Sequence, residues 1–307
     1  MVTMAHCAQR LSGEQFPSLF VSKDSFISVN MAIFMIASGF VMNIDKMKSI
    51  TTKDYILSKV CRLLVPMTVW FLVICIVSKQ LILSHYWSYY WYLSAMFLCL
   101  SFVKLLTNMI SNLYGVCLMS VIVLSLIPLI EFERSCYMIP FLWVGYLLRF
   151  CIHRIGWFLV IILIMVYILL YSYWDVSYSI YVSPFHIWEV DTHSVFSLIF
   201  RFLIGSVGGV AFISLSRLLI RCYGFRWIAL LANFGRYTLV FYTMSFVLNA
   251  ILERVMWHCN YITTPGYLDL ASFVMTILMM VVMYYFQVLV EKNKYLCLFL
   301  LGIYKYK

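Results

Sequence analysis

The sequence predicts an all-α integral membrane protein, a polytopic helix bundle with about nine full spans and a partial helix at its N-terminus. Of the 307 residues, 64% are hydrophobic and only 11% are charged, whereas soluble domains average about 25% charged residues. Long apolar runs recur along the whole chain, and Lys and Arg collect on alternate connections between them. These observations favour a membrane bundle over any soluble fold.

The apolar runs that could cross a bilayer are bounded by turn-forming or charged residues. They fall at 26–43, 60–78, 90–107, 112–131, 136–150, 155–172, 195–220, 227–250 and 269–290. A crossing helix needs roughly 20 residues, so the run at 136–150 is expected to lie in the protein interior or to cross nearly untilted. No long polar linker separates the runs, which predicts one domain over 1–307.

The two ends of the chain are expected to differ from these spans. Residues 1–8 resemble the end of a truncated first helix, because the apolar start is too short to cross a bilayer and lacks the parts of a cleavable signal peptide. Residues 291–307, EKNKYLCLFLLGIYKYK, have an apolar middle of about ten residues between basic ends. That middle is also too short to span, so a cytoplasmic tail along the inner membrane surface is predicted.

The distribution of positive charge predicts the orientation. Fifteen of the 22 Lys and Arg residues fall on the inner connections and tail, six, Arg201 among them, are counted at the outer side, and Arg236 alone is left within a span. This alternation follows the positive-inside rule and explains the net charge of +10 without nucleic-acid binding. The ten cysteines include no CxxC pair, and no metal-binding spacing is recognised.

Six stretches, in order along the chain, resemble the blocks of one membrane protein family. They are VNMAIFMIASGF (Val29–Phe40), DYILSKVCRLLVP (Asp54–Pro66), YYWYL (Tyr89–Leu93), FLWVGYLLR (Phe141–Arg149), RFLIGSVGGVAF (Arg201–Phe212) and LANFGRYTLVFY (Leu231–Tyr242). Together they resemble the acyltransferase 3 family, multispan membrane acyltransferases that commonly O-acetylate surface sugars. Each block alone is weak evidence, but their order and spacing across nearly the whole chain make the resemblance specific.

The resemblance implies a core of ten helices and a catalytic base at the outer end of the first. The family carries an Arg, ten residues and a His there, and His6 matches that His, whereas the Arg would lie before Met1. The chain is therefore expected to begin inside its first helix. An imidazole accepts a proton near neutral pH, as a base acting on a sugar hydroxyl must; the alternative is a histidine that simply lies in the headgroup layer.

Three basic residues are predicted to bind the acyl donor. Lys59 and Arg62 stand where the family usually has Arg-x-x-Arg, and they could bind the phosphates of coenzyme A. The alternative for this pair is ordinary anchoring at an anionic lipid surface. Arg236, as a charge within a span, is predicted to line a donor or acceptor channel, or else to pair with backbone carbonyls or an acid.

The outer loop from Tyr173 to Ser194 is predicted to bind the acceptor through Trp174, Asp175, Glu189 and Asp191. Aromatic rings can cover the apolar face of a sugar, and carboxylates can accept its hydroxyls. Interfacial Trp and Tyr also form the aromatic belt of any membrane protein, so this alternative stays open. No metal and no bound cofactor are expected.

The leading functional hypothesis is a stand-alone multi-pass acyltransferase of a bacterial inner membrane. It would transfer acetyl from cytoplasmic acetyl-CoA to a hydroxyl of an extracytoplasmic cell-surface or lipid-linked saccharide. The expected partners are acetyl-CoA, the saccharide and membrane lipids, but not nucleic acid. One alternative is a transporter or flippase for a glycan or lipid-linked sugar, but no convincing repeat is seen, and the only helix interruption expected, GSVGG at Gly205–Gly209, matches the acyltransferase pattern equally well. The other alternative is an inactive truncated acyltransferase.

Overall fold

The computed structural model describes residues 7, 11, 23–78, 86, 90–125, 130–178, 192–222, 238–257 and 265–302. Within these ranges the chain forms helices and no strand, as the sequence predicts. Four helical segments are long and apolar enough to cross a membrane, Thr52–Val77, Trp91–Met109, Thr192–Cys222 and Tyr267–Val290. Shorter apolar helices lie at Val29–Phe40, Leu113–Leu124 and Trp157–Tyr171.

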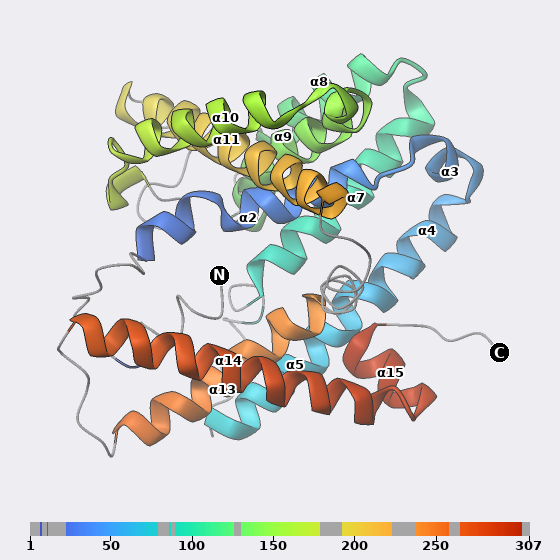
Figure 1. Cartoon of the computed structure of the whole chain (residues 1–307). Coiled ribbons are helices and arrows are strands. Elements are labelled where there is room, and N and C mark those ends of the chain that lie inside the picture. The colour runs from blue at the N-terminus through green and yellow to red at the C-terminus, as the bar shows by residue number, and fades with distance from the viewer. Residues whose placement is uncertain are drawn as a thin grey trace. The chain divides into compact units, whose positions relative to one another are not determined.

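Backbone contacts divide the chain into two compact units, and Figure 1 labels their helices. The first comprises Met1–Phe26, Val60–Tyr90 and Arg226–Lys307, and the second Ile27–Lys59 and Trp91–Phe225. Helices of the second unit are α2 (Lys23–Phe40), α3 (Ile44–Ser49), α4 (Thr52–Lys59), α7 (Trp91–Met109), α8 (Leu113–Ser125), α9 (Ile130–Cys151), α10 (Trp157–Tyr171) and α11 (Thr192–Cys222). Those of the first are α5 (Val65–Ser78), α13 (Thr238–Trp257), α14 (Pro265–Val290) and α15 (Lys294–Leu301).

The helix boundaries correct two expectations from the sequence. The run predicted as short, 136–150, belongs to α9, which has 22 residues and continues through Pro140. The GSVGG sequence at Gly205–Gly209 does not interrupt its helix, because α11 runs unbroken for 31 residues. Helix α9 is longer than the apolar run because it also includes the charged stretch Glu131–Arg134 before it. In α11, helix–helix packing overrides the local tendency of Gly to break a helix.

Glycines bring α2 into direct backbone contact with α9. A Cβ atom added to Gly39 would meet the carbonyl oxygen of Leu142, and one added to Gly145 would meet the carbonyl oxygen of Ile36. Two glycines, one on each helix, therefore let the two backbones touch. Close approach of this kind is how membrane helices gain packing energy, because lipid offers no hydrophobic driving force between them.

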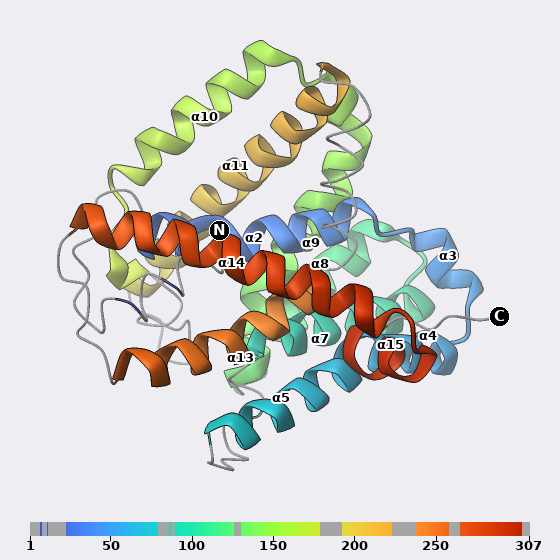
Figure 2. The ribbon, with the colours of Figure 1, turned by 60° about the horizontal axis from the view of Figure 1, so that its bottom comes forward.

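The glycines of α11 also lie against α2, and one of them lies against α9 as well. A Cβ atom at Gly205 would lie 2.8 Å from the Phe141 ring and 3.0 Å from the Cβ of Ala32. A Cβ atom at Gly208 or Gly209 would press on Val29 or Ile36 of α2. Helix α2 thus contacts both α9 and α11, and α10 lies along α11, as Figure 2 shows.

Basic residues at the ends of these helices bind backbone carbonyls. The ammonium group of Lys104, on α7, donates to the carbonyls of Met47 at 2.6 Å and Ile50 at 2.8 Å, and to Oδ1 of Asn108 at 3.0 Å. Its side chain is fully buried, and all three of its donors are used. Lys104 therefore fixes the C-terminal end of α3, where carbonyls lack helical partners and a cation is favourable.

Two arginines of the second unit act in the same way. Arg149 donates from Nη1 to the carbonyl of Met42 at 3.1 Å, and Arg217 donates from Nη1 to the carbonyl of Ile152. All three basic residues were counted on the predicted inner connections. These basic side chains therefore satisfy backbone carbonyls of the connections themselves, in addition to placing positive charge at this side.

The first unit packs α13 against α5 and α14, and α15 against α5. Trp70 of α5 donates to the carbonyl of Leu300 at 3.1 Å, and Gly302 ends α15 in the left-handed conformation with a φ of 64°. A Cβ atom there would meet the Arg62 carbonyl. Helix α15 is therefore held against protein along part of its surface; its predicted place at the inner membrane surface stays a prediction.

Large apolar side chains are exposed along α10 and α14, as expected of helices that face lipid. On α10 they are Trp157, Phe158, Leu159, Ile161, Ile162, Met165, Val166, Ile168 and Leu169, and on α14 Tyr267, Leu270, Phe273, Val274, Ile277, Leu278, Met280, Val281, Val282, Tyr284, Tyr285, Val288 and Leu289. Such surfaces would be unstable in water, and together with the apolar spans they establish an all-α membrane bundle.

Replacing Gly145 by Ala should destabilise the bundle, because the new methyl group meets the backbone of Ile36, which cannot move aside like a side chain. Overpacking of this kind costs about 1–3 kcal/mol or more. We expect a lower yield of monodisperse protein in detergent and a lower thermal unfolding midpoint. Gly156→Ala is the matched control, since nothing lies within 4 Å of a Cβ atom there. Equal midpoints for the two variants would contradict the close contact.

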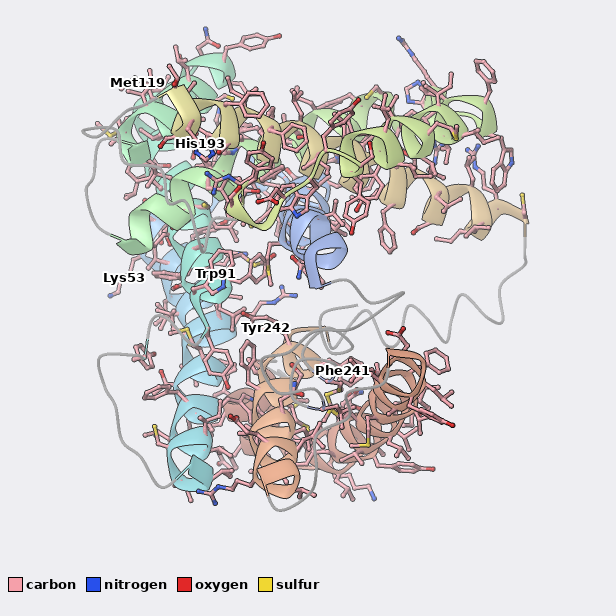
Figure 3. The ribbon with its side chains drawn as sticks, turned by 90° about the vertical axis from the view of Figure 1, so that its left-hand side faces the viewer. Lys53, Trp91, Met119, His193, Phe241 and Tyr242 are labelled. Carbon is pink, nitrogen blue, oxygen red and sulfur yellow. The ribbon has the colours of Figure 1, made fainter. Side chains whose placement is uncertain are left out.

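Replacing Lys104 by Met should also destabilise the protein, because a side chain of similar length then leaves three acceptors without their donor. Each buried group left unpaired costs about 1–3 kcal/mol. The thermal unfolding midpoint in detergent should fall. Lys53→Met is the control, because Lys53 is an exposed lysine of α4, labelled in Figure 3. A Lys104→Met protein that unfolds at the temperature of the wild type would refute this role.

Candidate functional site

Four of the eight predicted site residues are described by the structure: Lys59, Arg62, Trp174 and Asp175. The predicted base His6, the predicted channel residue Arg236, and the predicted acceptor contacts Glu189 and Asp191 lie outside the described residues. Their roles stay predictions. Among the described residues, no group of three or more His, Cys, Asp or Glu side chains is arranged to hold a metal ion.

Cys7, the neighbour of His6, packs against α14. It is helical and fully buried, and its Sγ lies 3.5 Å from Sδ of Met279. Both residues belong to the first unit. The thiol therefore acts as a small apolar side chain in a helix contact, as buried cysteines usually do.

The predicted donor residues Lys59 and Arg62 lie in different local structures. Lys59 ends α4, is half-buried, and places its Nζ 5.1 Å from the centroid of the Tyr55 ring. Arg62 lies in a π-helical turn, Val60–Leu64, and its side chain is exposed. The π-helical turn differs from a regular α-helix, in which Lys59 and Arg62, three residues apart, would lie on one face. Single π-helical turns occur frequently at functional sites, and the shared donor site stays a prediction.

Trp174 belongs to an aromatic cluster formed between the end of α10 and the start of α11. Its ring stacks on Phe200, with centroids 6.2 Å apart and planes at 20°, and meets Tyr178 edge-on at 6.2 Å. Tyr178 in turn contacts Phe200 at 5.3 Å and Phe196 at 5.8 Å. We call these four residues, with His193, the α10–α11 aromatic cluster; Figure 3 labels His193 near the start of α11.

Asp175 is exposed next to this cluster. The side chain and the backbone N–H of Ser177 both hydrogen-bond to its carboxylate, the N–H at 2.8 Å, and they lower the pKa of Asp175 below its usual value. The carboxylate is therefore ionised at neutral pH. Beside the half-buried Trp174 ring, it offers acceptor oxygens to a ligand that reaches the cluster.

Arg201 is a buried cation that the sequence analysis did not recognise as lying within a span. It was counted at the outer side, and the structure places it inside α11, a candidate span, with only 2% of its surface exposed. Its Nε donates to the carbonyl of Ser197 at 3.1 Å, and its Cζ lies 5.4 Å from the centroid of the Tyr137 ring of α9. Arg236 is thus not the one charge within a span. The sequence did contain a signal for Arg201, because this Arg lies inside the apolar run 195–220. A charge within an apolar run is a functional candidate, by the same argument that was applied to Arg236.

Three buried donor groups near this turn of α11 have no hydrogen-bond partner in the described structure. They are Nη2 of Arg201, Oγ of Ser197 and Nε1 of Trp174. Ser197 and Arg201 are four residues apart and therefore lie on one face of α11, while Trp174 stacks on Phe200 of the same turn. Unsatisfied buried donors are costly, so this arrangement is suited to a ligand that carries acceptor oxygens.

Comparison with known proteins identifies the family. The model of the acyltransferase 3 family, described as an acyltransferase domain, matches residues 1–290. Searches of the curated proteins and of the solved structures found no significant match. The family match includes all eight predicted site residues. The chain belongs to the acyltransferase 3 family and is a multi-pass membrane acyltransferase.

Proposed function

We propose that this acyltransferase moves an acetyl group from cytoplasmic acetyl-CoA to a hydroxyl of a saccharide on the outer side of a bacterial inner membrane. The family match over residues 1–290 carries the proposal, because it contains His6 together with the predicted donor and acceptor residues. The alternating distribution of Lys and Arg supports the orientation, with His6 near the outer surface.

In the proposed reaction, the imidazole of His6 takes the proton of the sugar hydroxyl. The sugar oxygen attacks the thioester carbonyl and forms a C–O bond, the C–S bond breaks, and the thiolate of coenzyme A takes the proton back from the imidazolium. The products are the acetyl ester and free coenzyme A, so atoms and charge balance. The step is ordinary general acid–base catalysis, worth about 10²- to 10⁴-fold in rate.

Binding of the two substrates is assigned to the predicted residues. Lys59, Arg62 and Arg236 hold the phosphates and the path of the donor. Trp174 covers the apolar face of the acceptor sugar, and Asp175 accepts its hydroxyls. Two observations support the acceptor assignment: the half-buried ring of Trp174 and the ionised, exposed carboxylate of Asp175 belong to adjacent residues.

Replacing His6 by Gln should lower acetyl transfer by about 10²- to 10⁴-fold, because the variant has no base for the hydroxyl proton. The measurement is O-acetylation of purified glycan by NMR, with release of coenzyme A from acetyl-CoA followed in proteoliposomes. His153→Gln is the control, because His153 is an exposed histidine that follows α9. A stably inserted His6→Gln protein with wild-type transfer would exclude the base role.

Replacing Trp174 by Leu should raise the KM for the saccharide about tenfold, equal to about 1.4 kcal/mol, because the ring that covers the sugar is lost. The KM for acetyl-CoA should not change. Trp157→Leu is the control, since Trp157 is 44% exposed at the start of α10, away from the described cluster. If both variants changed the saccharide KM equally, Trp174 would be only part of the aromatic belt.

A further inference from the structure

No residue that the structure describes neutralises the charge of Arg201. A guanidinium stays protonated in proteins, and a buried charge is costly unless it is paired. Arg201 makes one hydrogen bond to a carbonyl and one contact with the Tyr137 ring, and no ion pair of Arg201 occurs among the described residues. These neighbours offer partial negative charge only, so the described part of the chain supplies no full negative charge to Arg201.

Lys104 shows what a purely structural buried cation looks like in the same unit. Each of its three donors has an acceptor within 3.0 Å, and the lysine thereby holds backbone together. Arg201 has five N–H donors, and within the described ranges only Nε meets a protein acceptor, while the buried Nη2 meets none. The difference indicates that Arg201 is arranged for a partner outside the described chain.

The other unpaired groups are suited to the same kind of partner. Oγ of Ser197 and Nε1 of Trp174 are both buried without hydrogen bonds. A neutral sugar hydroxyl could accept one such bond but would leave the charge of Arg201 uncompensated. A carboxylate or a phosphate offers several acceptor lone pairs and a negative charge together, and Arg binds both with paired hydrogen bonds.

The aromatic cluster includes Phe200, the residue before Arg201 on α11, and several of its members are exposed. Phe196 is 54% exposed, His193 and Asp175 are exposed, and Trp174 is half-buried. Among these described residues the acidic group is Asp175, which would disfavour an anion. Asp175 is in water, which screens its charge, whereas the charge of Arg201 is buried and acts at full strength.

We propose that Arg201, Ser197 and Trp174 form a subsite for an anionic group of the acceptor, so that the acceptor is an acidic saccharide. This inference rests on the proposed saccharide acetyltransfer and deepens it. The anionic group is a carboxylate, as in a uronic acid, or a phosphate. The ring of Trp174 and the carboxylate of Asp175 then contact the sugar to which that group is attached.

The test compares three acceptors with the wild-type protein in proteoliposomes. They are an oligosaccharide that contains uronic acid, the same oligosaccharide after reduction of its carboxyl groups, and a phosphorylated form of the reduced one. We expect at least a hundredfold higher kcat/KM for one of the two anionic acceptors than for the neutral one. The preferred anion identifies the source of the charge, carboxylate or phosphate.

Variants then assign the preference to the subsite. Arg201→Gln should reduce kcat/KM for the preferred anionic acceptor about a hundredfold and leave the neutral acceptor and the KM for acetyl-CoA unchanged. Ser197→Ala should cost about tenfold for the anionic acceptor only, and Trp174→Phe should lower kcat/KM about tenfold more for the anionic acceptor than for the neutral one; Trp174→Phe keeps an aromatic ring and removes the N–H. These two variants keep the test valid if Arg201→Gln does not fold. Arg217→Gln, on the same helix, is the control.

Two results would overturn the inference while the proposed function stands. One is equal acetylation of anionic and neutral acceptors by the wild type. The other is a preference for the anion that survives in Arg201→Gln, or in both Ser197→Ala and Trp174→Phe. Failure of the wild type to acetylate any of the three saccharides would instead overturn the proposed function, and this inference with it.

Discussion

The close contact of α2 with α9 and α11 is the interaction on which the second unit depends. Glycines at Gly39 and Gly145 remove the side chains that would keep α2 and α9 apart, and Gly205 leaves room for Phe141 and Ala32. In lipid, packing of this kind replaces the hydrophobic effect as the main attraction between helices. The same packing brings α9 and α11 together. One helical turn from the contact of Gly205 with Phe141, the Tyr137 ring meets the Arg201 guanidinium.

Basic residues have two distinct roles in the second unit. Lys104, Arg149 and Arg217 donate to backbone carbonyls at helix ends and connections. Carbonyls at helix ends lack donors within the helix, so hydrogen bonds of this kind satisfy the carbonyls and stabilise the positive charge. Arg201 lies within α11 beside the Tyr137 ring, and its Nη2 has no hydrogen-bond partner in the part of the chain that the structure describes. The residue types are similar, but their surroundings separate a structural cation from the one that we propose binds a ligand.

The two sides of the proposed reaction make different physical demands. The donor carries phosphates and must be bound near the inner surface, where the chain has most of its Lys and Arg. The acceptor must lie near His6 at the outer side, where the proposed contacts are aromatic rings, a carboxylate and buried N–H donors. This division follows from acyl transfer across a bilayer, in which the two substrates start on opposite sides.

The sequence by itself determined the fold class, the positions of the main helices and the family, because apolar length, alternating charge and ordered motifs are local signals. It also singled out Trp174 and Asp175, but counted Arg201 with the outer residues and took Gly205–Gly209 for an interruption. Only the tertiary structure decided these two cases. The neighbouring helices determine whether a buried cation has acceptors, and they also determine whether a glycine breaks its helix or allows close packing against another.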